Sequence, residues 1–261
     1  MAKKTFQGGA HPPEFKEYSE KIAIETLPAP ERVIIPVVQH LGAPGKPTVK
    51  KKDHVLMGQP VSEPGGFVSV PSHASVSGEV KDVSEYPHPF GRKILSVEIT
   101  NDGEDEPFRD FSVQDGYLDL SPDEMRTRIR DAGLAGMGGA AFPTHVKLNP
   151  PENKPINTTI INGAECEPFL TADHRLMLEQ GESIFKGLEI INKILKPRKS
   201  YIAVENNKPD AIKHLQDIAK NFPGVEVVGL QVKYPQGAEK QLIRALTGRE
   251  GTHAAAYVYC A

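Results

Sequence analysis

The sequence has no tryptophan and only two cysteines, Cys166 and Cys260, among its 261 residues. Two thiols are too few for a disulfide framework, and so few cysteines suggest a reducing compartment. An iron–sulfur cluster needs four thiolates, so this sequence cannot hold one. No run of about 18 apolar residues is present, so no membrane-spanning helix is expected. The start, MAKKTFQGGAHPP, lacks the apolar core expected of a signal peptide. A formal net charge of -3 gives no indication of nucleic-acid binding.

Short apolar segments fill the chain up to about residue 115. Gly, Pro and Ser separate them, as in VIIPVV (33–38), GFVSV (66–70) and ILSVEI (94–99). Many short strands with frequent turn signals predict a small β barrel or sandwich. Residues 100–116, TNDGEDEPFRDFSVQDG, are acidic and rich in turn-forming residues, which predicts a linker.

The pattern changes at Ser121, where SPDEMRTRIRDAG predicts a short helix with Ser121 and Glu124 as a capping box and Gly133 at its C-terminal end. Strands are then predicted at 157–163, 200–205 and 225–232, and helices at 171–195, 208–222 and 237–248. This alternation predicts a parallel sheet covered by helices, whose ligands bind beyond the carboxyl ends of the strands. NGAECEP (162–168) and YPQGAEK (234–240) lie at two such ends.

A dense glycine segment, GLAGMGGAAFPTHVK, occupies residues 133–147. It is not a P-loop, because Lys147 lies eight residues past the last glycine and no Ser or Thr follows it. The dinucleotide fingerprint GxGxxA fits residues 136–141, but that motif must leave a strand and open a helix. Here a helix precedes it and Phe-Pro follows. From these residues alone, a ligand-binding loop and a plain helix-to-strand connection both stay open.

Three further features favour a ligand. Glu165 and Glu167 could bind ribose hydroxyls or a flavin N–H. The alternative is that their negative charges stabilise the N-terminus of the next helix through its dipole. Gly237 opens a helix whose free N–H groups suit a phosphate, although a routine strand–helix turn explains it as well. Lys147 could face a phosphate or an anionic reduced flavin, or it is a surface lysine.

Together these segments resemble the flavin-bearing NADH-oxidising subunit of respiratory complex I. They are more similar to the C-subunit of the Rnf complex, an ion-translocating ferredoxin:NAD oxidoreductase. The matching segments are GMGGAAFPTHVK (136–147), NGAECEP (162–168), LTADHRLMLE (170–179), VENNKPDAI (204–212) and FQGGAHPPEFK (6–16). The resemblance covers residues from about 5 to 250.

The resemblance implies an α/β domain that binds FMN and NAD(H) for hydride transfer, with no nucleophile or general base of its own. The glycine backbone would wrap the flavin, Phe142 would lie against a nicotinamide or adenine ring, and Lys147 would bind the flavin or its phosphate. The implied cofactor-binding residues are Gly136, Gly138, Gly139, Ala140, Phe142, Lys147, Asn162, Glu165, Glu167, Tyr234, Gly237 and Glu239.

Residues from about 31 to 99 also resemble a biotinyl or lipoyl barrel-sandwich domain, which carries its prosthetic group on a lysine at a hairpin tip. No lysine occurs between Lys52 and Lys81, and the tip region SEPGGFVSV (62–70) offers no amine. A swinging-arm carrier is therefore disfavoured, and an interaction or structural role is expected.

The expected organisation has three parts. A barrel-sandwich domain with its linker spans 1–115, and an α/β domain of the complex I flavin-subunit type, with a Rossmann-like parallel sheet, spans 116–250. Residues 251–261, GTHAAAYVYCA, leave the family pattern abruptly and are expected to be an extraneous tail of a truncated chain. In the family, ferredoxin-like cysteine runs for two [4Fe–4S] clusters follow, and they are expected only in the missing part.

Two functions stay open. The first is an electron-entry or electron-exit module of a membrane-bound complex. Its partners would be the other Rnf subunits, and it would lie peripherally at the cytoplasmic face of the bacterial inner membrane. The second is a scaffold, because the A-subunit of the sodium-pumping NADH:quinone reductase resembles this chain in fold yet lacks the flavin site. The intact glycine and NGAECEP motifs favour the first.

Overall fold

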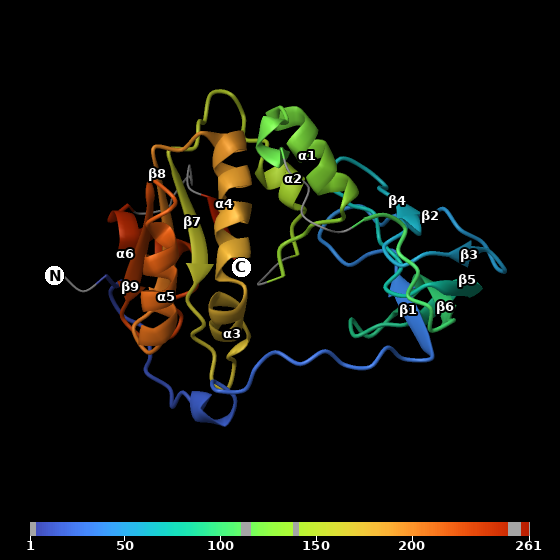
Figure 1. Cartoon of the computed structure of the whole chain (residues 1–261), viewed down its shortest axis with the longest axis horizontal. Helices are drawn as coiled ribbons and strands as arrows, with labels where there is room; N and C mark the ends of the chain where they lie inside the picture. The colour runs from blue at the N-terminus through green and yellow to red at the C-terminus, as the bar shows by residue number, and fades with distance from the viewer. Residues whose placement is uncertain (1–3, 111–115, 138–140, 250–256, 261) are drawn as a thin grey trace. The chain divides into compact units, whose positions relative to one another are not determined.

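The computed structural model describes residues 4–110, 116–137, 141–249 and 257–260. The chain divides into two compact units (Figure 1). Residues 26–149 form the first, here called the β unit, and residues 1–25 with 150–261 form the second, the α/β unit. This division groups residues 1–25 and 116–149 differently from the domain ranges expected from the sequence, and those ranges stay a prediction.

The β unit is built on an antiparallel sheet of four strands in the order β1-β6-β5-β3. The strands are β1 (Arg32–Pro36), β3 (His54–Val55), β5 (Gly78–Pro87) and β6 (Lys93–Asn101), and β2 (Lys46–Pro47) pairs separately with β4 (Ser62–Glu63). Inward-facing side chains form its core, whose buried members are Ile35, Val37, Val55, Val61, Ala74, Val76, Val80, Val97 and Ile99. Aliphatic residues that recur between turns therefore fold as the small β domain that the sequence predicts.

Helical segments follow in the same unit: η2 (Tyr117–Asp119), α1 (Pro122–Asp131) and α2 (Thr144–Lys147). The predicted capping box of α1 is present, because the Ser121 hydroxyl accepts from the Glu124 N–H and the Glu124 carboxylate accepts from the Ser121 N–H. After α1, Gly133 has a φ of +72°, and a Cβ there would come within 2.7 Å of the Pro71 carbonyl oxygen. Only glycine suits this turn.

The α/β unit contains four parallel strands in the order β10-β7-β8-β9. They are β7 (Thr158–Gly163), β8 (Lys199–Glu205), β9 (Val225–Leu230) and β10 (Tyr257–Cys260). The helical elements are η1 (Lys16–Tyr18), α3 (Ala172–Glu179), α4 (Gly181–Leu195), α5 (Pro209–Ala219) and α6 (Glu239–Thr247). The predicted parallel sheet is confirmed.

Helices cover this sheet. The α6 side chains Leu242, Ile243 and Leu246 share a core with Ile160 and Leu230, and Figure 1 shows α4 and α5 in front of the strands. The helical segment expected at 171–195 is two helices that meet at Gln180. Among the described residues, no helix combines the length and the apolarity needed to cross a membrane.

The strand order reverses at β7. Strands β7, β8 and β9 follow one another across the sheet, and β10 then lies on the opposite side of β7, with Tyr257–Cys260 in register with residues 159–162. Such a reversal is a topological switch point, where ligands of parallel sheets bind beyond the carboxyl ends. The strand β10 lies within the stretch expected to be an extraneous tail, and its pairing with β7 makes it part of the sheet.

Candidate functional site

The two predicted strand-end motifs of the α/β unit meet at the carboxyl end of β7. The Asn162 side chain donates to the Gly237 carbonyl oxygen at 2.9 Å and accepts from the Ala164 N–H at 3.1 Å. A Cβ on Gly237 would lie 2.5 Å from the Ala164 carbonyl oxygen. Asn162 and Gly237 therefore join NGAECEP to YPQGAEK at the switch point.

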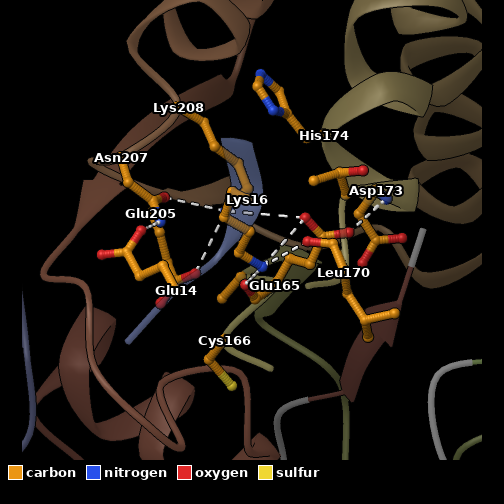
Figure 2. Close-up of polar contacts among 12 residues, drawn as sticks. Glu14, Lys16, Glu165, Cys166, Leu170, Asp173, His174, Glu205, Asn207 and Lys208 are labelled. Carbon is orange, nitrogen blue, oxygen red and sulfur yellow. Dashed lines mark hydrogen bonds and ion pairs between the residues drawn. The ribbon is translucent and has the colours of Figure 1, made fainter. Parts of the chain in front are cut away.

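A group of buried charges lies beside this junction, and we call Lys16, Glu165, Glu205 and Lys208 the charge cluster (Figure 2). The Lys208 ammonium lies 3.4 Å from Glu205 Oε2 and 4.0 Å from Glu165 Oε2. The Lys16 ammonium lies 3.7 Å from the same Glu165 oxygen. The other Glu165 oxygen accepts from the Asp173 N–H at 2.8 Å. Two cations thus face two carboxylates at the ends of β7 and β8.

Desolvation dominates the electrostatics of this site. Burial lowers the pKa of the Lys16 ammonium, against the attraction of Glu165. Burial raises the pKa of the Glu205 carboxyl, with Lys208 opposing it. The pKa of Asp173 rises to about 6, first because of burial and then because of the Glu165 charge. Because charged groups are costly to bury without full pairing, the cluster would gain from further hydrogen-bond donors.

Glu165 Oε2 and Glu205 Oε1 are buried and have no hydrogen-bond partner among the described residues. A cavity of about 90 Å³ opens beside them, with Lys16, Cys166 and Tyr234 also in its wall. Pockets for cofactor-sized ligands usually measure roughly 300–1,000 Å³. The cavity by itself therefore holds a few waters or one edge of a larger ligand.

The other predicted residues of the α/β unit lie nearer the surface. Glu167 is exposed, and its backbone carbonyl oxygen accepts a hydrogen bond from the Lys16 ammonium at 2.9 Å. Tyr234 is 43% exposed, and its backbone pairs with Ala10 through two hydrogen bonds of 2.8 Å. Glu239 is exposed at the first position of α6. Thus Tyr234, Glu165 and Cys166 share one cavity wall, whereas Glu239 has no described contact with it.

The glycine segment belongs to the β unit, so its pairing with the charge cluster stays a prediction. Its two ends are held together, since the Gly136 N–H donates to the Phe142 carbonyl oxygen and the Thr144 N–H to the Leu134 carbonyl oxygen, both at 3.0 Å. Phe142 and Lys147 are half-buried, and Lys147 ends α2. Three predicted contacts, Gly138, Gly139 and Ala140, lie outside the described residues.

Loops of the β unit contact the ends of the glycine segment. A His73 ring nitrogen lies 3.0 Å from the Asp131 carbonyl oxygen at the end of α1. The Leu41 N–H donates to the Ala141 carbonyl oxygen at 3.0 Å. A His145 ring nitrogen lies 3.3 Å from the carbonyl oxygen of Phe67, which belongs to the tip region 62–70. Where a carrier domain would present a lysine, this tip therefore contacts α2, the helix at the C-terminal end of the glycine segment.

Sequence reasoning missed Lys16, Glu205 and Lys208. A signal existed for the last two, because an apolar strand, SYIAVE, ends in a charged residue and NNKPD follows. An ionisable residue at the end of a buried strand is a candidate for a site. Lys16 gave no such signal, because it lies about 150 positions from its partners in the chain.

Two family models match the chain. The model described as "RnfC Barrel sandwich hybrid domain" matches residues 4–104, and the one described as "Nuo51 FMN-binding domain" matches residues 129–258. Together they cover most of the sequence and confirm the predicted fold class. The second match runs through β10, which supports the place of that strand in the sheet.

Similar proteins carry consistent names. The C-subunit of the proton-translocating ferredoxin:NAD(+) oxidoreductase complex of Clostridium ljungdahlii is 49% identical over 95% of this chain and 54% of its own length. The C-subunit of the Na(+)-translocating complex of Acetobacterium woodii is 49% identical over 94% of this chain and 56% of its own length. A solved structure, an air-oxidized NAD+-reducing [NiFe]-hydrogenase, aligns with a TM-score of 0.47 at 23% identity, over 54% of this chain and 28% of that chain. The chain spans about half the length of the curated relatives it matches.

Proposed function

The chain belongs to the RnfC family of ion-translocating ferredoxin:NAD(+) oxidoreductases, and on this premise we propose that it is the NAD(H)- and FMN-binding module of such a complex. The observation that carries the proposal is the match to an FMN-binding domain over residues 129–258. That range contains both the glycine segment and the loop that follows β7. Family relatives at 49% identity are named as oxidoreductase subunits.

The described residues fit a flavin nucleotide in two respects. Among the described residues, a Cβ on Gly136 would meet nothing closer than the Phe142 carbonyl oxygen at 3.9 Å, so their packing does not require a glycine there. This leaves room for a ligand beside the described part of the segment. The unpartnered oxygens of Glu165 and Glu205 suit ribityl or ribose hydroxyls or a flavin N–H, all of which are donors.

Each residue of the proposed site has a role in binding or orientation. The backbone at Gly136, Gly138, Gly139 and Ala140 would contact the flavin, Phe142 would contact a nicotinamide or adenine ring, and Lys147 would bind a phosphate. Asn162, Glu165 and Glu167 bind hydroxyls, and Tyr234, Gly237 and Glu239 flank the nucleotide. When bound, FMN and NAD(H) supply the hydride chemistry, and the chain holds their rings in contact and excludes water.

The partners in this proposal are the remaining subunits of a membrane-bound Rnf-type complex. The chain would attach peripherally through them at the cytoplasmic face of the bacterial inner membrane. Electrons would pass between the flavin and [4Fe–4S] clusters in the part of the relatives that this chain does not span. No described residue is assigned to those clusters.

Flavin titration tests the proposal. The purified chain is titrated into FMN, and flavin fluorescence is followed for the wild type, Gly136→Val and Gly187→Ala. Gly187 lies in α4, and a Cβ there also meets nothing within 4 Å, so it is a matched glycine control. We expect saturable quenching for the wild type and the control, and a Kd at least tenfold higher for Gly136→Val, whose unfolding free energy should stay within about 0.5 kcal/mol of the wild-type value.

Two results would argue against the proposal. Equal affinity in Gly136→Val would remove the glycine segment from the flavin site. A folded wild type that quenches no flavin, and whose ultraviolet spectrum is unchanged by NADH, would favour the scaffold function instead.

A further inference from the structure

The N-terminal segment 14–19 lies against the loop that follows β7, here called the post-β7 loop and defined as residues 164–171 (Figure 2). The Phe169 N–H donates to the Glu14 carbonyl oxygen at 2.9 Å, and the Ser19 and Thr171 hydroxyls lie 2.8 Å apart. The rings of Phe15 and Phe169 stack with centroids 4.8 Å apart. Segments about 150 positions apart in the chain thus form one structural unit.

Lys16 is the buried centre of this contact. Its ammonium donates to three backbone carbonyl oxygens of the post-β7 loop: Glu165 at 2.8 Å, Glu167 at 2.9 Å and Leu170 at 2.5 Å. A lysine ammonium has three N–H donors, so all of them are used. The carbonyl groups of a loop that turns this tightly have few other partners, and Lys16 satisfies three of them at one point.

The consequence reaches the Glu165 side chain. Because the Lys16 donors make their short contacts with carbonyl groups, the ammonium, 3.7 Å from Glu165 Oε2, acts on that oxygen mainly through its charge. Lys208 does the same from 4.0 Å. Oε2 therefore lies beside two cations, one of which it shares with Glu205, and has no hydrogen-bond partner among the described residues, while Oε1 is fixed by the Asp173 N–H. A carboxylate held in this way is oriented before a ligand arrives.

We propose that Lys16 is a positioning residue: it holds the post-β7 loop in shape and presents Glu165 Oε2 to a hydroxyl or N–H of the bound nucleotide. This inference rests on the proposed function. It assigns to the N-terminal segment, which lies outside the FMN-binding match, a part in building the nucleotide site. Lys16 itself touches no reacting atom in this role.

The test uses Cys166, which lies between two of the carbonyl groups that Lys16 holds and is half-buried. In a Cys260→Ser background, the rate of Cys166 alkylation by iodoacetamide reports the loop directly. Lys16→Met keeps the aliphatic stem and removes the ammonium, and Lys21→Met is the matched control, because Lys21 lies five positions further along the chain and is exposed. The Kd values for FMN and for NADH are measured on the same samples.

We expect Lys16→Met to speed alkylation about tenfold and to raise the nucleotide Kd about tenfold, while Lys21→Met changes neither. Lys16→Arg keeps the charge, but a planar guanidinium cannot serve three converging carbonyl groups, so a smaller change of both quantities is expected. If Lys16→Met does not fold, Lys16→Arg provides the test in its place. In a Glu165→Gln background, Lys16→Met should raise the Kd much less than in the wild type, because its effect acts through Glu165.

Each outcome decides a part of the inference. Wild-type alkylation rates in Lys16→Met and Lys16→Arg would overturn the anchoring of the loop. Faster alkylation with unchanged Kd values would overturn its link to the nucleotide site. A wild type that binds neither FMN nor NADH would overturn the proposed function and that link together, while the alkylation rates would still decide whether Lys16 anchors the loop.

Discussion

The glycine segment of the β unit and the post-β7 loop of the α/β unit carry most of the predicted site residues, and different groups hold them in place. Backbone hydrogen bonds close the described ends of the glycine segment, and no described residue would crowd a side chain at Gly136. Buried lysines hold the post-β7 loop, and a Cβ on Gly237 would collide with its backbone. Glycine therefore has a packing role beside the post-β7 loop, whereas the described residues around Gly136 assign it none.

The comparison teaches how to interpret a glycine in a binding motif. At Gly237 the protein itself needs the space, so the residue says nothing about a ligand. At Gly136 no described residue needs the space, so the described packing gives no reason for a glycine and a bound ligand would. Substitutions that separate stability from binding can break or sharpen this contrast.

The largest effect is expected from Lys208→Met. Lys208 is 2% exposed and faces Glu205 and Glu165, so its removal leaves buried carboxylates with one cation fewer. We expect the unfolding free energy to fall by about 3–5 kcal/mol, measured by urea denaturation. The control is Lys220→Met, whose exposed pair with Asp217 should contribute no more than about 1 kcal/mol. Equal losses in the two variants would show that the charge cluster does not hold its loops.

Gly237→Ala should have an intermediate effect. Its new Cβ would lie 2.5 Å from the Ala164 carbonyl oxygen, so the backbone must move. Overpacking of this kind costs about 1–3 kcal/mol of unfolding free energy. Gly187→Ala, in a helix with open space, should instead raise stability by up to about 1 kcal/mol. A Gly237→Ala variant as stable as the wild type would contradict the packing role assigned to this glycine.

The smallest effect concerns pH. The pKa of Asp173 is raised to about 6 in the folded chain by burial, and next by Glu165. The folded state therefore binds the proton more tightly than the unfolded state does. The resulting stability is complete below about pH 4 and is lost as the pH rises through 6.

Asp173→Asn removes this titration. Its unfolding free energy relative to the wild type should therefore grow by about 1 kcal/mol between roughly pH 4 and 7, after allowance for screening at this half-buried carboxyl. Urea denaturation at the two pH values measures the difference, in which other titrating groups cancel. A difference that does not change with pH would contradict the raised pKa.

Local sequence signals predicted the elements that depend on local chemistry. The capping box at Ser121 and Glu124, the parallel strands and the turn at Gly133 all follow from patterns within a few residues. The same signals identified Asn162, Glu165 and Gly237 as strand-end residues, and the structure brings them together. These features are short in sequence, so composition and spacing suffice to find them.

Long-range partners were beyond such signals. Lys16 contacts a loop about 150 positions away, and nothing in FQGGAHPPEFK distinguishes a buried lysine from a surface one. The break between α3 and α4 at Gln180 depends on the packing of distant residues, because Gly181 lies against Ile218 of α5. The strand β10 was missed because its partner β7 lies nearly a hundred positions earlier.

The pairing of β10 with β7 has a consequence for the synthesis of the protein on the ribosome. Until residues 257–260 are made, one side of β7 presents free backbone N–H and C=O groups, and its side chains are those of a strand buried at every position in the finished fold. Bare apolar edges of this kind invite pairing with other chains. The nascent chain therefore exposes this edge of β7 during the interval between the synthesis of β7 and that of β10.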